Sequence, residues 1–163
     1  MRLERLGPRH AEELLAGQDA ELAREIIGRR WERAGLEAFL ERSARWREDG
    51  PLCELAAVDA DGALQGGGGL NAIAPGLERG QAALTYWVLA RHRGRGIGRR
   101  IAAGIVREAR SRGTVAELVL LIAPENRASC AIARELGAVP TDGPRRHPAD
   151  PARSVRRWLL PLC

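Results

Sequence analysis

The sequence predicts a single mixed α/β domain, and three observations lead to that class. Apolar residues recur at helical spacing through much of residues 8–48. Two apolar runs that flank Asp61-Gly62 then predict a β-hairpin. From residue 82 onward, apolar strands alternate with amphipathic helices, and we find no repeat, low-complexity segment or domain linker. We therefore expect one domain over residues 1–163, a length that suffices to bury a core.

The first half of the chain predicts a strand, three helices and a hairpin. Pro8 can start a helix and Asp19 can cap the next one. The four glycines at 66–69 weaken the second strand of the hairpin, and they indicate a bulge or a close approach by another backbone. The predicted elements are a strand at 1–6, helices at 8–17, 19–31 and 36–48, and a hairpin at 52–73.

The second half predicts strands and helices in alternation. Both helices have an apolar stripe at helical spacing, and the second one ends at Gly137. The stripes comprise Ile97, Ile101, Ile105 and Ala109 in the first helix, and Ala128, Ile132 and Leu136 in the second. The predicted strands cover residues 82–90 and 116–123, with two short ones around 138–146 and 153–160.

Composition excludes several classes of protein. No apolar run is long enough to span a bilayer, and the N-terminus has no apolar signal core, so we expect a cytoplasmic protein without membrane contact. The three cysteines, at 53, 130 and 163, have no metal-ligand spacing. They are therefore read as reduced thiols, with Cys130 a small buried apolar residue, and no metal site is expected.

The positive charge is concentrated in one segment. The chain contains no lysine and has a formal net charge of +5, yet Arg91–Arg112 alone holds eight arginines against one acid, a balance of +7. Such density implies a polyanionic partner, either a phosphorylated small molecule or a nucleic acid. The segment lacks interleaved aromatic residues, a recognition helix and a zinc pattern, which argues against nucleic acid. Outside the glycine-rich part, we read Arg91, Arg107, Arg110 and Arg112 as a solvated face.

Three glycines, Gly94, Gly96 and Gly98, lie where a strand leads into a helix. The first N–H groups of a helix lack partners and carry the positive end of its dipole, so they can hold an anion. Glycine lets the backbone approach a bulky phosphate and adopt a positive φ without strain. The Walker and dinucleotide-binding patterns both fail here. The stretch therefore predicts a pyrophosphate site of another kind.

The spacing Arg93-x-x-Gly96-x-Gly98 resembles the [Q/R]-x-x-G-x-[G/A] signature of the GNAT superfamily of N-acetyltransferases. The stretch "PENRAS…LGA" at 124–138 further resembles the branch that acetylates the N-termini of ribosomal proteins. The resemblance implies a mixed, mostly antiparallel, splayed sheet of six to seven strands flanked by helices. It also implies an enzyme that transfers acetyl from acetyl-CoA to a primary amine of a small molecule or a peptide N-terminus, and it allows a homodimer.

The resemblance assigns cofactor contacts residue by residue. The strand before the loop would hold the pantetheine arm, the loop would hold the pyrophosphate, and the helix after the next strand would contribute near the thiol. These positions are Trp87, Val88 and Leu89, then Arg93, Gly94, Arg95, Gly96, Ile97, Gly98 and Arg99, and finally Asn126 and Ser129. The helices of 8–48 and the loops around 74–80 and 141–152 would shape the acceptor pocket.

The catalytic groups follow the family less closely. Ser129 matches a serine that protonates the leaving thiolate, and His147 lies nearest to the base position of the ribosomal-protein branch. Alanine stands at 133 and leucine at 121, where many relatives have a tyrosine acid and a glutamate base. Glu54 and Tyr86 are the next candidates, although each is also explained as an ordinary strand residue. A non-catalytic acyl-CoA-binding relative, acting as a sensor or partner subunit, remains the alternative.

Overall fold

A computed structural model describes residues 1–26, 29–141 and 143–162 of the chain. Eight strands form one sheet in the order β1-β2-β3-β4-β5-β8-β6, and β7 pairs with β8 off this path. The strands are β1 (Arg2–Arg5), β2 (Leu52–Val58), β3 (Leu64–Asn71), β4 (Gln81–Val88), β5 (Glu117–Ile122), β6 (Val139–Pro140), β7 (Arg145–His147) and β8 (Asp150–Pro161). The helices are α1 (Ala11–Gly17), α2 (Ala20–Ile26), α3 (Arg33–Ser43), α4 (Ile97–Arg112) and α5 (Arg127–Glu135), with 3-10 turns at Pro8–His10 and Ala90–His92.

The mixed, mostly antiparallel sheet confirms the predicted fold class. Only the β4–β5 pair is parallel, and the other strand pairs in the described chain are antiparallel. The sheet has one strand more than the six to seven expected, because the tail forms a long β8 that pairs with β5, β6 and β7. Within the described residues, no helix is long and apolar enough to cross a membrane.

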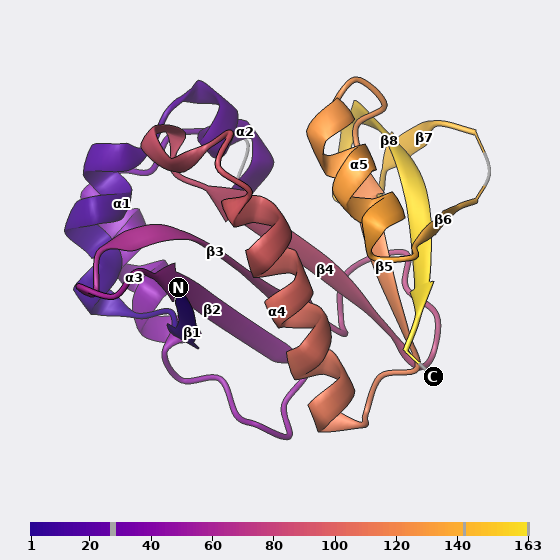
Figure 1. Ribbon diagram of the computed structural model, residues 1–163, viewed down its shortest axis with the longest axis horizontal. Helices are drawn as coiled ribbons and strands as arrows, with labels where there is room; N and C mark the ends of the chain where they lie inside the picture. Colours follow the sequence, from indigo (N-terminus) through magenta and orange to yellow (C-terminus); the bar gives the residue numbers. More distant parts are fainter. Residues whose placement is uncertain (27–28, 142, 163) are drawn as a thin grey trace.

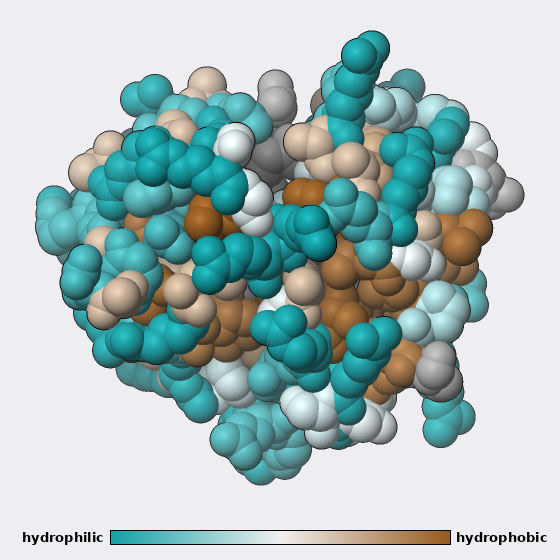
Figure 2. Space-filling model, viewed as in Figure 1, coloured by the Kyte–Doolittle hydropathy of each residue, from teal (hydrophilic) through white to brown (hydrophobic). Residues whose placement is uncertain are grey.

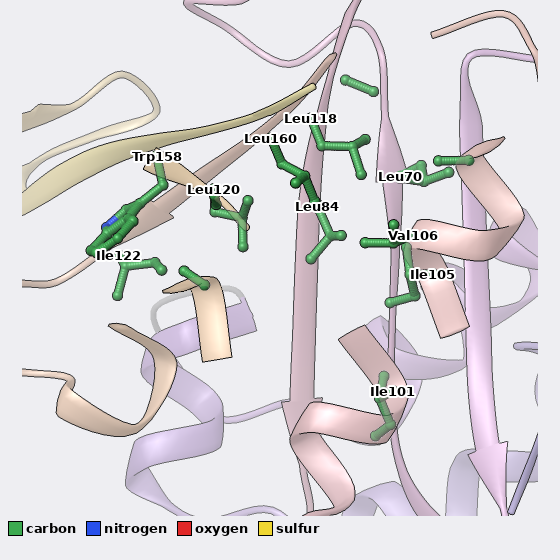
Figure 3. Close-up of a cluster of buried hydrophobic side chains, with 14 of the residues drawn as sticks. Leu70, Leu84, Ile101, Ile105, Val106, Leu118, Leu120, Ile122, Trp158 and Leu160 are labelled. Atoms are coloured by element: carbon green, nitrogen blue, oxygen red, sulfur yellow. The ribbon is translucent and has the colours of Figure 1, made fainter. Parts of the chain in front are cut away.

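Two helical layers cover the sheet on opposite faces (Figure 1). Successive residues of β2 alternate between two apolar clusters, with Cys53, Leu55 and Ala57 in one and Ala56 and Val58 in the other. The first cluster joins the sheet to α4 and α5, and Figure 3 shows its Ile101, Ile105, Leu118 and Trp158. The second cluster joins the sheet to α1, α2 and α3. On the α4 face, apolar surface shows on both sides of α4 among polar side chains (Figure 2).

Two helices end earlier than predicted. The helix capped by Asp19 was expected to reach Trp31, but α2 is assigned to Ile26 and residues 29–32 are not helical; positions 27 and 28 lie outside the described residues. The third helix was expected to reach Glu48 and ends at Ser43. Its end is set by tertiary contacts, because Arg5 Nη1 donates to the carbonyls of residues 44 and 46, at 2.9 and 2.5 Å.

The apolar stripe of α5 is only partly buried. Cys130 and Ala133 are the buried residues of this helix, so the prediction of a buried Cys130 is confirmed. Ala128 is exposed and Ile132 is half-buried. Ala128 and Ile132 therefore line a groove described below, whereas Leu136 of the same stripe packs against the core.

The four glycines of β3 allow close packing on both of its faces. A Cβ added at Gly66 or Gly68 would come within 2.8 Å of the Cδ1 atom of Ile101 or Ile105 of α4, respectively. On the other face, a Cβ at Gly67 would lie 2.6 Å from the Trp87 indole, and one at Gly69 would lie 2.9 Å from the Glu54 carboxylate. The predicted close approach is thus made by side chains on both faces as well as by the neighbouring backbones.

Candidate functional site

The two halves of the sheet diverge between β4 and β5. These strands pair over only three residues, from Gln81 opposite Glu117 to Ala83 opposite Val119. Beyond that point each strand continues beside a different neighbour, β4 along β3 and β5 along β8. The resulting wedge is visible in Figure 1 between the β4 side and the β5–β8 side of the molecule. Beyond the paired residues, both strands contribute side chains to the wall of a cavity described below.

The first cavity is a groove of about 510 Å³ between the glycine loop, the end of β4 and α5. Gly94 and Gly96 both have a φ of +72°, in the left-handed region that favours glycine. The first turn of α4 contains no acidic residue, and its first N–H groups have no partner within the helix. Tyr86 Cε2 lies 3.3 Å from the position of a Cβ on Gly98, so this glycine admits the tyrosine ring. The loop geometry fits an anion at the helix start.

Arg93 holds the loop in place instead of pointing freely into the groove. Its guanidinium pairs with Asp19 at 2.6 Å and Glu21 at 2.9 Å, and its Nε donates to the Val88 carbonyl at 3.1 Å. The hydrogen bonds from Arg93 lower the pKa of the Asp19 carboxyl to about 2. The arginine of the motif therefore ties the loop to the start of α2.

The other arginines of the basic segment differ in their exposure and partners, and Arg107 and Arg110 are exposed as predicted. Arg99 reaches Glu135 at 3.1 Å on the groove wall, while Arg95 is exposed. Arg91 pairs with Glu13 at 2.9 Å. For Arg112 the predicted solvated position is wrong, because its side chain is only 9% exposed. It pairs with Glu108 and lies over the Trp46 ring, 4.8 Å from the ring centre.

The strand and loop residues assigned to the cofactor do not all reach the groove. Leu89 and Arg95 do not line it, whereas the other assigned strand and loop residues do, namely Trp87, Val88, Arg93, Gly94, Gly96, Ile97, Gly98 and Arg99. Leu89 is fully buried in the core shared with α1–α3, and its N–H donates to the Gln65 backbone carbonyl at 3.0 Å. Its backbone is therefore committed to the sheet.

A hydrogen bond joins β4 to α5 in the wall of the groove. The Tyr86 hydroxyl donates to Ser129 Oγ at 2.9 Å. The Asn126 side chain caps α5, because its Oδ1 accepts the Ser129 N–H at 3.0 Å. Ser129 is thus held from both sides, and the sequence held no signal for the tyrosine contact, since the two partners are 43 residues apart.

The second cavity, of about 360 Å³, meets the first at this bond. Tyr86, Trp87, Asn126 and Ser129 line both cavities. Residues from the segment before β2 and from the loops around 74–80 and 141–152, where the family resemblance predicts the acceptor pocket, also line it, together with residues of the sheet. They include Leu6, Leu14, Trp31, Leu36, Phe39, Ala74, Pro75, His147 and Ala149.

Glu54 and His147 bring titratable groups to this second cavity. Glu54 lies on β2 in the same row as Gly69 and Thr85, and the missing side chain at Gly69 makes room for its carboxylate. Burial raises the pKa of Glu54 to about 7. His147 Nδ1 accepts the Ala149 N–H at 3.1 Å. The structure therefore brings Ser129, Tyr86, Glu54 and His147 to one connected pair of cavities. Among the described residues, no group of three or more His, Cys, Asp or Glu could hold a metal ion.

Comparisons with known proteins agree with this architecture. The family model for the acetyltransferase (GNAT) domain matches residues 1–139. A search of curated proteins found no significant match. Similar solved structures include spermidine N-acetyltransferase from Vibrio cholerae in complex with CoA and spermine, with 16% identity, coverage of 99% of this chain and 95% of that one, and a TM-score of 0.79.

Two further structures are alike to a similar degree. YncA, a putative acetyltransferase from Salmonella typhimurium with its cofactor acetyl-CoA, has 17% identity, covers 100% and 94% of the two chains, and has a TM-score of 0.74. A putative ribosomal-protein-serine acetyltransferase from Vibrio cholerae has 20% identity, coverage of 98% and 92%, and a TM-score of 0.72. At these identities the likeness concerns the fold alone.

Proposed function

The chain belongs to the GNAT acetyltransferase family, and on this premise we propose that it transfers the acetyl group of acetyl-CoA directly to a primary amine. The observation that carries the proposal is the Tyr86–Ser129 hydrogen bond, because it lies where a groove suited to the donor meets a cavity suited to the acceptor. Each of the two hydroxyls can donate a hydrogen bond or act as a general acid.

The groove fits the donor in size and charge. Its volume of about 510 Å³ lies in the range of small-molecule sites. The glycine loop and the first turn of α4 would hold the pyrophosphate through backbone N–H groups. Carboxylates at the groove wall are already paired, Glu21 with Arg93 and Glu135 with Arg99, so they oppose an anion less than free carboxylates would. Acetyl-CoA supplies an activated acyl group when bound there.

We assign to Tyr86 the role of general acid. Many relatives have a tyrosine for this role at the position that is Ala133 here. The Tyr86 hydroxyl comes from β4 instead of α5 and reaches Ser129, whose own proton can be donated to the departing sulfur. The pair then relays a proton from Tyr86 through Ser129 to that sulfur. With this hydroxyl pair in place, the missing family tyrosine no longer favours a non-catalytic acyl-CoA-binding protein.

Glu54 is the base that we assign to the amine. A base works best when its pKa is near the working pH, and burial brings the pKa of Glu54 to about 7. Its carboxylate lies in the acceptor cavity and accepts the ammonium proton directly or through one water. His147 lines the same cavity from β7 and is the competing candidate.

The finer assignments are also proposals. The stretch at 124–138 supports the ribosomal-protein N-terminal branch, while solved structures from three kinds of acetyltransferase have comparable TM-scores. We further propose that residues 1–163 form one domain, because β8 pairs with β5 in the same sheet.

The proposal is tested by calorimetry with acetyl-CoA followed by an acceptor screen. We expect binding that weakens with added salt, and weaker binding of acetyl-pantetheine, which lacks the nucleotide. The screen records CoA release and the mass of an acetylated product for amino acids, peptides, polyamines and aminoglycosides. A protein that binds acetyl-CoA but yields no acetylated amine would be the non-catalytic alternative.

A further inference from the structure

We propose that the acceptor is a primary amine whose adjacent carbon carries an apolar side chain of leucine to tryptophan size, and that polycationic amines are poor acceptors. This inference rests on the proposed function and concerns the 360 Å³ acceptor cavity. It is carried by the walls of that cavity and by its balance of charge.

Aromatic side chains from the segment before α3, from α3 and from β4 line the acceptor cavity. Trp31 and Phe39 stack with their ring centres 5.0 Å apart. They pack on the buried core that contains Leu14 and Leu36. Trp87 lines the same cavity from β4, where its indole lies against Gly67. An apolar substituent entering between these elements would lose water from most of its surface, which favours its binding.

The described lining residues of the acceptor cavity include too few carboxylates to neutralise a polyamine. Among its described lining residues, Glu54 is the one carboxylate, and the other charged or imidazole groups are Arg153 and His147. A polyamine brings several ammonium groups, and a buried ammonium without a partner is costly. One ammonium beside Glu54 is balanced by that carboxylate. The cavity therefore favours a monoamine over a polycation.

Two kinds of molecule carry such an amine, a free amino acid and a peptide with its N-terminal residue. Both present an amine next to a carbon with a variable side chain. The recognised part is the same, so the experiment includes both. Phenylalanine and the peptide Phe-Ala-Ala form the apolar arm, glycine and Gly-Ala-Ala form the matched control arm, and spermidine represents polycations.

The first measurement is kcat/KM for these acceptors at saturating acetyl-CoA. We expect each phenylalanine acceptor to exceed its glycine match by roughly tenfold to hundredfold, the value of burying one large apolar side chain. Spermidine should fall below both phenylalanine acceptors. The Phe39→Ala variant should reduce the preference for phenylalanine over glycine about tenfold, whereas Phe39→Leu should keep most of it. Thermal unfolding checks that both variants are folded.

The second measurement needs neither turnover nor a variant. Calorimetry on the CoA-loaded protein compares the affinity for phenylalanine with that for glycine. Tighter phenylalanine binding without any acetylated product would support the apolar cavity and reject the proposed transfer. Efficient spermidine acetylation, or equal kcat/KM for phenylalanine and glycine acceptors, would overturn the inference and leave the transfer reaction standing. Equal affinities of the CoA-loaded protein for both amino acids would overturn it as well.

Discussion

Replacing Glu54 by glutamine should stabilise the protein at alkaline pH, because it removes a buried carboxylate. Burial raises the pKa of this group from its ordinary value of 4.5 to about 7. Between these values the folded chain holds a proton that the unfolded chain has lost, so stability falls as pH rises through this window. Above pH 7 the penalty is complete. At about 1.36 kcal/mol per pKa unit, it amounts to about 3 kcal/mol.

The gain from Glu54→Gln should therefore depend on pH. We expect about 3 kcal/mol at pH 8.5 and about 1 kcal/mol or less at pH 5, where the native carboxyl is already protonated. Urea unfolding with linear extrapolation at both pH values gives these free energies. The Glu41→Gln variant is the control, since Glu41 is exposed and its replacement should change stability little at either pH. A gain that is the same at both pH values, or a loss at pH 8.5, would refute the reasoning.

The same variant also tests the assigned base. The wild-type kcat/KM should rise with pH through about 7 as Glu54 ionises, and Glu54→Gln should lower the rate by roughly 10²- to 10⁴-fold and remove that limb. His147→Ala should keep the limb. If the rise of kcat/KM with pH disappears in His147→Ala and remains in Glu54→Gln, the histidine is the base.

Three further predictions follow from the loop, the hydroxyl pair and the buried arginine. Gly96→Val should weaken acetyl-CoA binding in calorimetry, since φ is +72° there, while Gly113→Val, with a φ of +63° at the other end of α4, should cost similar stability and leave affinity unchanged. Ser129→Ala and Tyr86→Phe should each lower kcat on the order of 10²-fold with little change in the Kd of acetyl-CoA, and the double variant should be no slower than the worse single one; parental rates would exclude the pair from catalysis. Arg112→Ala should lower the free energy of urea unfolding by about 1–2 kcal/mol, and a change under about 0.5 kcal/mol would indicate a solvated side chain.

Features that depend on residues close together in the chain could be predicted from the sequence. The hairpin around Asp61-Gly62 and the stripe from Ile97 to Ala109 depend on spacings within short segments, and both are confirmed. Gly94 and Gly96 have the positive φ that glycine permits, while the pyrophosphate site predicted there stays a prediction. Asp19 is also confirmed as a helix cap, since its Oδ1 accepts the Leu22 N–H at 2.8 Å. Such signals survive folding because backbone conformation and burial periodicity are local properties.

The candidate site required the tertiary structure. Tyr86 and Ser129 meet only because β4 and β5 separate after three paired residues, and Glu54 reaches the cavity only because Gly69 lies beside it in the register of β2 and β3. The direction of the Arg93 guanidinium depends likewise on α2, 72 residues away at Glu21. Sequence spacing carries no information on which strands become neighbours or where they splay. Those relations are decided by the packing of the two apolar clusters on opposite faces of the sheet, which involves the whole chain at once.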